Sequence, residues 1–235
     1  MGGRGSKSGM SGGGGFHEFK DKAASSHTYE GDGKEAEQFF MNTTNVDILI
    51  DNMSSQEKGY FREWASGRFM DGQQYMGWDK MTIGERRRTQ AYDDILDQAT
   101  LERGVVLTRR SDAQLVMGAG VRRASASDFK GMEGQLITSK GSMSFGAASQ
   151  GLTIGASGKT VEYKLKIPGG TVGSGMWIGD SRINGWGSKQ REFMTNRDAV
   201  FKVGKSSFDS ARGITTVELT YMGHTEHDYG TSGSH

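Results

Sequence analysis

The sequence predicts an α+β protein in which helices come first and strands follow. Apolar residues recur at helical spacing up to about residue 99, whereas beyond residue 104 they form short runs or alternate with polar residues. Helices followed by strands, rather than strict alternation of the two, are typical of α+β folds. The length of 235 residues fits one domain with or without tails.

Composition excludes several classes of protein. There is no cysteine, so disulfides, thiolate metal sites and cysteine nucleophiles are excluded. The net charge of +1 gives no basic footprint for nucleic acid over the whole surface. The N-terminus lacks the apolar stretch of a signal peptide, and no apolar run is long enough for a membrane span. We therefore expect a soluble chain.

Glycine content divides the chain into three parts. With 37 glycines in the chain, many near the N-terminus, residues 1–37 are predicted to be a flexible arm. Residues 38–222 carry the globular pattern, and residues 223–235 are predicted to be a flexible tail. His224 and His227 are residues that can bind zinc, but the glycine-flanked tail offers no apolar scaffold. We therefore interpret them as solvated and expect no metal.

Two helix starts can be assigned from capping spacing. Ser54 is followed three residues later by Glu57, and Thr82 by Glu85, the spacing of a capping box. Apolar residues follow each start at helical spacing, and these are Tyr60, Phe61 and Trp64, then Tyr92, Ile95, Leu96 and Ala99. The first half of the domain is therefore predicted to be helical.

The strands are predicted from alternation and from short apolar runs. Residues 161–167 alternate apolar and charged side chains, the two-residue period of a half-buried strand. Further candidates are residues 104–108, 193–194, 200–203 and 214–221.

Three separate segments carry candidate functional residues. The run 105–110 ends in Arg109 and Arg110, whose guanidinium groups suit a pyrophosphate. Residues 134–146 contain serines followed by glycine. In residues 187–203, Gln190 and Glu192 are two apart, so on a strand their side chains would point the same way.

The order and spacing of these segments resemble the ADP-ribosyltransferase family of the Arg–Ser–Glu type. That family has an arginine ending a strand, a Ser-Thr-Ser strand, and a Glu/Gln-x-Glu entering a strand. Residues 163–171 are similar to its strand closing in Pro-x-Gly-Thr, and residues 192–203 to its glutamate strand and the Phe-Lys-Val strand after it. The resemblance covers residues 38–222. It implies a split β core of two packed, mostly antiparallel sheets, with N-terminal helices and NAD in the cleft.

The resemblance also implies a role for each matched residue. Glu192 matches the glutamate that contacts the ribose and stabilises the oxocarbenium-like transition state. Arg109 matches the phosphate clamp, and Ser144 the first serine, which orients the glutamate. Ser144 with Phe145 and Gly146 replaces Ser-Thr-Ser, so these three residues are assigned with Arg109 and Glu192 to cofactor binding.

Gln190 matches the position that faces the acceptor. An amide cannot help to deprotonate a guanidinium but suits a neutral amide or a base edge. This glutamine resembles the one in Rho-modifying exoenzymes, which act on asparagine, and in pierisin-like enzymes, which act on guanine. Trp186 is a candidate acceptor contact, with burial in the core as the alternative.

Two alternative assignments of the motifs stay open. Arg110 would be the clamp if the strand register were shifted by one residue, and Thr138 with Ser139 would then be an alternative serine strand. We prefer Ser144 because Lys140 and Gly141 lie where the family has Lys-Gly before its motif. Thr108 stands where the family carries an aromatic residue.

The resulting expectation is a monomeric, metal-independent mono-ADP-ribosyltransferase that consumes NAD. A protein acceptor other than arginine is favoured over nucleic acid because the net charge is near zero. The alternatives are an NAD glycohydrolase, a guanine-modifying transferase and a catalytically degenerate binding module. The glycine-rich opening is similar to those of phage-encoded proteins, which implies an effector acting in the cytoplasm of a bacterial host.

Overall fold

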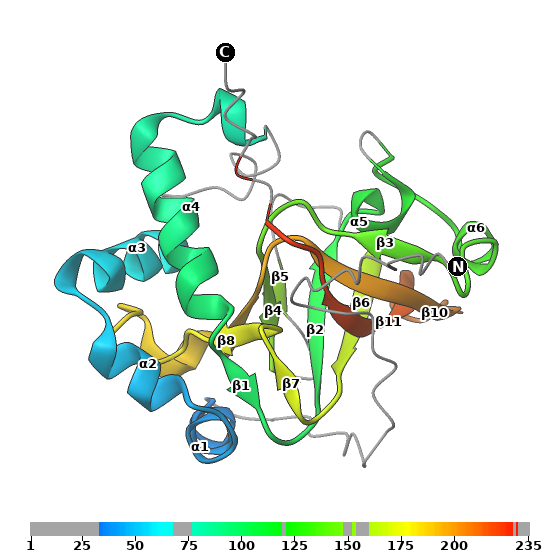
Figure 1. The fold of residues 1–235 in the computed structure, drawn as a ribbon. Helices are drawn as coiled ribbons and strands as arrows, with labels where there is room; N and C mark the ends of the chain where they lie inside the picture. Colours follow the sequence, from blue (N-terminus) through cyan, green and yellow to red (C-terminus); the bar gives the residue numbers. More distant parts are fainter. Residues whose placement is uncertain are drawn as a thin grey trace, which may run out of the picture.

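The longer helices, α1 to α4, precede the strands in the computed structural model, whereas only short helices lie among the strands. The structure describes residues 33–67, 77–118, 121–147, 152–153, 160–227 and 229 (Figure 1). The predicted α+β order is confirmed. Most of the predicted arm lies outside the described residues. Its last part, however, enters helix α1 (Lys34–Thr43), so the ordered fold begins before the predicted boundary at residue 37.

Helices α3 and α4 begin where the capping residues predicted. In α3 (Ser55–Ala65) the Ser54 hydroxyl accepts from the Glu57 N–H, and the Glu57 carboxylate accepts from the Ser54 N–H. Thr82 and Glu85 form the same reciprocal pair at the start of α4 (Ile83–Leu96). Each box satisfies two backbone donors that the first helical turn leaves unpaired. The other helical segments are α2 (Val46–Asn52), η2 (Trp78–Lys80), α5 (Gln114–Met117) and α6 (Ala126–Lys130).

Most strands join one sheet with the order β3-β10-β11-β6-β2-β4-β9-β8, and β5 pairs with β2 beside this path. Neighbours are antiparallel except for the β6–β11 and β2–β5 pairs. A small second sheet pairs β1 (Thr100–Leu101) with β7 (Thr171–Val172). The strands of the large sheet are β2 (Val105–Ser111), β3 (Leu136–Thr138), β4 (Met143–Gly146), β5 (Leu152–Thr153), β6 (Val161–Ile167), β8 (Gly175–Trp177), β9 (Glu192–Thr195), β10 (Ala199–Asp209) and β11 (Ile214–His224).

The expected split of the core lies between β2 and β4. These two strands share a single residue pair, Thr108 with Gly146, whereas β2 pairs with β6 along seven residues. The strands therefore form two groups, β3-β10-β11-β6-β2 and β4-β9-β8, which meet at one narrow junction. The two packed sheets expected from the sequence are thus two parts of one hydrogen-bonded network.

Aromatic side chains pack the N-terminal helices onto the smaller group of strands. The ring of Phe40 in α1 stacks on Trp177 of β8 at 4.8 Å between centroids and contacts Phe193 of β9 at 5.5 Å. Trp64 in α3 meets Tyr92 in α4 edge to face. Aromatic pairs of this kind bury large apolar areas and fix the angle between elements. They hold α1 against β8 and β9, and α3 against α4.

The prediction of a flexible tail from residue 223 is wrong for the described residues up to His227. Strand β11 continues through His224, and the side chain of His227 is only 5% exposed, against Asp97 and Asp198. The sequence around the histidines showed no apolar scaffold. In the structure His227 packs against the carboxylates of Asp97 and Asp198, which come from distant segments. No local sequence pattern indicates such contacts.

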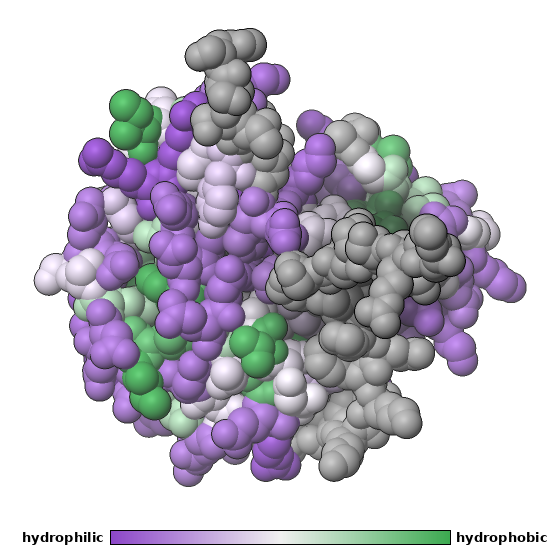
Figure 2. All heavy atoms as spheres, in the orientation of Figure 1, coloured by the Kyte–Doolittle hydropathy of each residue, from purple (hydrophilic) through white to green (hydrophobic). Residues whose placement is uncertain are grey.

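Within the described residues, no helix combines the length and the apolar character needed to cross a bilayer. On the face drawn in Figure 2, hydrophobic residues over the α1–α4 side form small patches separated by hydrophilic ones. Small separated patches are normal on the surface of a folded domain.

Candidate functional site

Three adjacent strands bring the predicted site residues together. Strand β4 carries Ser144 and lies between β2, which carries Arg109, and β9, which begins with Glu192. All three side chains are buried. Polar groups are rarely buried without partners, so a concentration of them at a junction between strands is typical of a binding or catalytic site.

Ser144 is contacted from two sides. The Arg109 guanidinium donates from Nη1 to the Ser144 carbonyl at 3.1 Å. The indole Nε1 of Trp64 donates to the Ser144 hydroxyl at 2.9 Å. A hydroxyl has two acceptor lone pairs and one donor, so accepting from Trp64 directs its own proton toward another group.

Glu192 lies directly opposite Gly146 in the β4–β9 pairing, and Ser144 lies opposite Met194. Residues directly opposite each other share a face of the sheet, and so do residues two apart on one strand. Ser144 and Glu192 are therefore diagonal neighbours on one face. The glycine between them adds no side chain, which leaves room beside the carboxylate.

Phe145 lies in a different environment from Ser144 and Gly146, and its assignment to cofactor binding stays a prediction. Its side chain is fully buried in the hydrophobic core, on the opposite face of β4 from Ser144 and Gly146. The alternation of side chains along a strand causes this separation. Phe145 therefore supports the strand, and Gly146 keeps its place beside Glu192.

Gln190 is not on the strand that carries Glu192. It ends the short helix η3 (Gly187–Gln190), Arg191 adopts a left-handed backbone with φ 49°, and β9 begins only at Glu192. The argument that the two side chains point the same way on a strand is therefore wrong. Their orientation is set by the turn.

Asn184 fixes the orientation of the Gln190 amide. The backbone N–H of Trp186 donates to Asn184 Oδ1 at 2.9 Å, so the other end of the Asn184 amide is its NH₂ group. That group donates to Gln190 Oε1 at 3.0 Å. The donor end of Gln190 is thus the end directed away from Asn184.

Trp186 lies on the same loop and is 63% exposed. The alternative of burial in the core is therefore wrong. An exposed tryptophan beside a polar amide combines a large apolar surface with hydrogen-bonding capacity, a combination enriched where proteins bind partners.

The alternative registers do not assemble a site. Thr138 ends β3, which pairs with β10 at the far edge of the sheet, and the Ser139 hydroxyl donates to the Gly141 carbonyl. Arg110 pairs instead with the buried carboxylate of Glu162, which also binds Arg212. This pairing explains why Glu162 is buried within a strand predicted to be half exposed.

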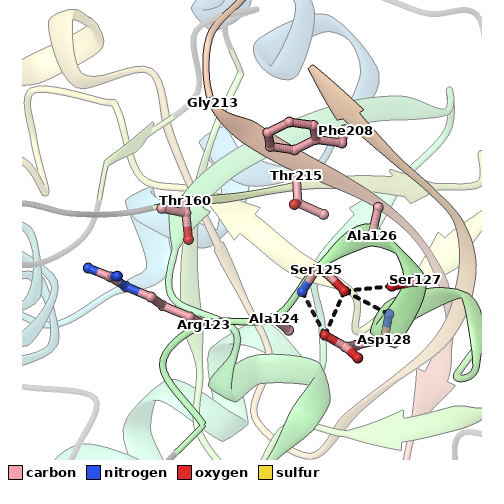
Figure 3. Close-up of a pocket in the computed structure, with 10 residues that line it drawn as sticks. All are labelled: Arg123, Ala124, Ser125, Ala126, Ser127, Asp128, Thr160, Phe208, Gly213 and Thr215. Atoms are coloured by element: carbon pink, nitrogen blue, oxygen red, sulfur yellow. Dashed lines mark hydrogen bonds between the residues drawn. The ribbon is translucent and has the colours of Figure 1, made fainter. Parts of the chain in front are cut away.

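A hollow of about 670 Å³ lies elsewhere on the protein, between the segment 123–128 and strands β10 and β11 (Figure 3). Phe208, Thr160 and Thr215 lie around it, and no predicted site residue lines it. Ser125 and Asp128, which also line it, are hydrogen-bonded to each other as the capping pair at the start of α6.

Sequence reasoning missed two residues that contact the site. Trp64 was recognised only as part of a helix face, because an apolar residue at helical spacing signals packing and not a hydrogen bond to a serine 80 positions later. Asn184 gave no signal at all. A further group of potential metal ligands, Asp97, His224 and His227, lies apart from these residues.

The fold matches that of solved ADP-ribosyltransferase toxins. Plx2a, an ADP-ribosyltransferase toxin from Paenibacillus larvae, superposes with a TM-score of 0.66 and 15% identity, over 83% of this chain and 98% of that one. C3stau2 from S. aureus, solved with NAD, superposes with a TM-score of 0.63 and 13% identity, over 85% of this chain and 100% of that one. The Clostridium limosum C3 exoenzyme superposes with a TM-score of 0.64 and 14% identity, over 84% of this chain and 97% of that one.

Neither protein-family models nor curated protein sequences give a match. The likeness to the toxins is therefore one of structure at low sequence identity, and it defines the fold class.

Proposed function

We propose that this protein is a mono-ADP-ribosyltransferase that cleaves the bond between nicotinamide and ribose in NAD and transfers ADP-ribose to a macromolecule. The observation that carries the proposal is the meeting of Arg109, Ser144 and Glu192 on three adjacent strands of an ADP-ribosyltransferase fold. Fold alone does not define activity, but these residue types at this junction supply the separate groups that the reaction needs.

Each of the three residues has a distinct proposed task. Arg109 binds the pyrophosphate, because its planar guanidinium offers several donors and a permanent charge. Glu192 stabilises the positive charge that develops on the ribose as nicotinamide departs with the bonding electrons. Ser144 acts as a positioning residue that orients the Glu192 carboxylate. The acceptor nucleophile then bonds to the ribose carbon and loses its proton.

The acceptor is proposed to be a protein side chain other than arginine. Gln190 Oε1 accepts a hydrogen bond from Asn184, which leaves the NH₂ group of Gln190 as a donor. This donor suits an ADP-ribose acceptor whose side chain carries a carbonyl oxygen. A guanidinium offers only donors and fits this arrangement poorly. The net charge of +1 supports a protein over nucleic acid, since phosphate backbones favour basic surfaces.

The test uses the full chain as a monomer in solution, NAD labelled on its adenylate half, and a bacterial lysate. Label that enters macromolecules and is released by protease supports the proposal, whereas release by nuclease moves the acceptor to nucleic acid. Free ADP-ribose that still requires Glu192 indicates an NAD glycohydrolase. No consumption of NAD would overturn the enzyme assignment in favour of a binding module.

A further inference from the structure

Three metal-ligating side chains meet at one end of the sheet, away from the proposed catalytic residues. Asp97 caps the C-terminus of α4, His224 ends β11, and His227 follows three residues later. One ligand atom of each lies within 4.8 Å of the other two. The group therefore brings together two imidazoles and a carboxylate from segments about 130 residues apart.

Hydrogen bonds turn the same ring nitrogen of both histidines toward Asp97. The Nδ1 atom of His224 lies 3.1 Å from the Thr225 carbonyl, and Nδ1 of His227 lies 3.2 Å from the Asp198 carboxylate. Both partners can only accept, so each Nδ1 carries the proton. Metal-binding histidines typically show this arrangement, with Nδ1–H on a carbonyl or carboxylate and Nε2 on the metal.

The distances suit a small divalent cation. Nε2 of His227 lies 3.1 Å from Asp97 Oδ1, and Nε2 of His224 lies 3.8 Å from the same oxygen. In a tetrahedral zinc site with bonds of about 2.0–2.2 Å, neighbouring ligand atoms are about 3.3 Å apart. The two observed distances bracket this value, and the partly exposed Asp97 leaves a fourth position open to water.

The surroundings favour positive charge at this place. Arg197 forms ion pairs with the buried Asp93 and with Asp198. Among the described residues, no ion pair joins Arg197 to Asp97. Carboxylates of Asp198 and Asp97 lie 3.2 and 3.1 Å from the two ring nitrogens of His227. A divalent cation bound here would be attracted by the same carboxylates.

Gly173 keeps the space beside the ligands open. Its φ of 73° is in the left-handed region, and a Cβ atom built there would lie 2.6 Å from Nε2 of His224. Any larger residue would collide with the ligand atom of this histidine. The neighbouring Asn196 donates to Asp97 Oδ1 at 2.6 Å and so holds the carboxylate in place.

We propose that Asp97, His224 and His227 bind one zinc ion. Two imidazoles and one carboxylate are a ligand set that suits zinc. Asn196, which touches Asp97, lies four residues beyond Glu192 on the chain that forms β9, or about 13 Å along a strand. The ion therefore has a structural task, to tie the segment after β11 to the end of α4, and takes no part in the reaction.

The test titrates the full chain, first stripped with a chelator, with zinc chloride. Calorimetry and elemental analysis measure the stoichiometry, and thermal unfolding measures the gain in stability. One ion per chain is expected, with a rise in Tm of about 5–10 °C at a hundredfold excess over Kd. Replacement by Co²⁺ should give the strong visible absorption of a tetrahedral site.

His224→Ala is the principal variant because His224 makes fewer buried contacts than His227 and its loss should leave the fold intact. It should lose the stoichiometric ion and the zinc-dependent rise in Tm, while its Tm in chelator stays close to that of the parent. Asp97→Asn should weaken binding in the same way. The matched control replaces the three other histidines of the chain, His17, His27 and His235, by alanine and should keep both effects.

Absence of stoichiometric zinc binding by the parent chain would overturn the proposal. So would unchanged binding by His224→Ala, or loss of binding by the triple-histidine control. These results do not depend on NAD turnover, so they stand whatever the outcome of the activity assay.

Discussion

The indole N–H of Trp64 donates a hydrogen bond of 2.9 Å to the hydroxyl of Ser144, joining helix α3 to the strand between Arg109 and Glu192. Both side chains are buried, so the bond is shielded from water and fixes the serine rotamer. The helices before the sheet thus contribute directly to the geometry of the proposed site. Their aromatic packing on Tyr92 keeps the indole in place.

Trp64→Phe should lower catalysis more than it lowers folding stability. A six-membered ring remains, but the five-membered ring and its N–H are lost. The Ser144 oxygen therefore loses a donor, at a cost of about 1–3 kcal/mol for a buried polar atom left without its partner. We expect kcat for NAD cleavage to fall about tenfold with little change in KM, because the proposed task of Ser144 is to position Glu192. A change confined to KM, or none, would contradict the positioning role.

Glu192→Gln should abolish both transfer and NAD hydrolysis. The amide keeps the size of the side chain but removes the charge that stabilises the transition state, a loss of about 10²–10³ in kcat. Steady-state release of nicotinamide measures it. The control is Glu218→Gln, which removes an exposed glutamate from β11 and should leave the rate unchanged. Full activity of Glu192→Gln would show that the site assignment is wrong.

Gln190→Ala should reduce transfer to the macromolecule and spare part of the NAD hydrolysis. The substitution removes the amide that is proposed to face the acceptor, and water needs no such contact. Gln190→Glu is the matched variant, since a carboxylate can still accept from Asn184. It should shift transfer toward arginine acceptors, measured by labelling of a guanidino compound. Equal loss of both activities in Gln190→Ala would argue against the acceptor role.

Trp186→Ala should raise the KM for the macromolecular acceptor without changing the KM for NAD. The side chain is 63% exposed, so its removal creates no core cavity and should change stability by less than about 0.5 kcal/mol. Phe208→Ala is the control, because Phe208 is 61% exposed but lies on β10 beside the hollow of Figure 3. A similar rise in the KM for the acceptor in both variants would indicate a general surface effect.

Asp93→Asn should destabilise the fold strongly. Arg197 Nε lies 2.8 and 2.9 Å from the two carboxylate oxygens of Asp93, and both side chains are buried. Removing one partner of a buried ion pair costs up to about 3–5 kcal/mol, and Asp198, which also pairs with Arg197, compensates part of the remaining charge. Urea unfolding in chelating buffer measures it. Asp94→Asn changes the exposed neighbour on the same helix and should have little effect.

Local features of the fold could be predicted because they depend on residues close in sequence. The capping boxes at Ser54 and Thr82 need only partners three positions away, and both formed as expected. The alternation in residues 161–167 likewise predicted strand β6. The motif order predicted the strands of Arg109, Ser144 and Glu192, since the resemblance fixed which strand each residue occupies.

Predictions failed where distant segments or a turn set the environment. Gln190 and Glu192 were expected to point the same way as on a strand, but Gln190 ends a short helix and the left-handed Arg191 separates it from β9. His227 was assigned to a solvated tail, but its ring nitrogens lie within hydrogen-bonding distance of Asp97 and Asp198. Phe145 was assigned to the cofactor site by its place in the motif; its side chain is buried in the core, and this assignment stays a prediction.

The sequence by itself determined the α+β class, the helix starts and the three residue types that define the proposed chemistry. These depend on periodicity, on capping and on the order of short motifs, all of which are local along the chain. The tertiary structure decided which residues surround them, among them Trp64 on Ser144 and Asp97 beside two histidines. Such contacts join positions far apart in sequence, and only the packing of helices onto a folded sheet brings them within hydrogen-bonding distance.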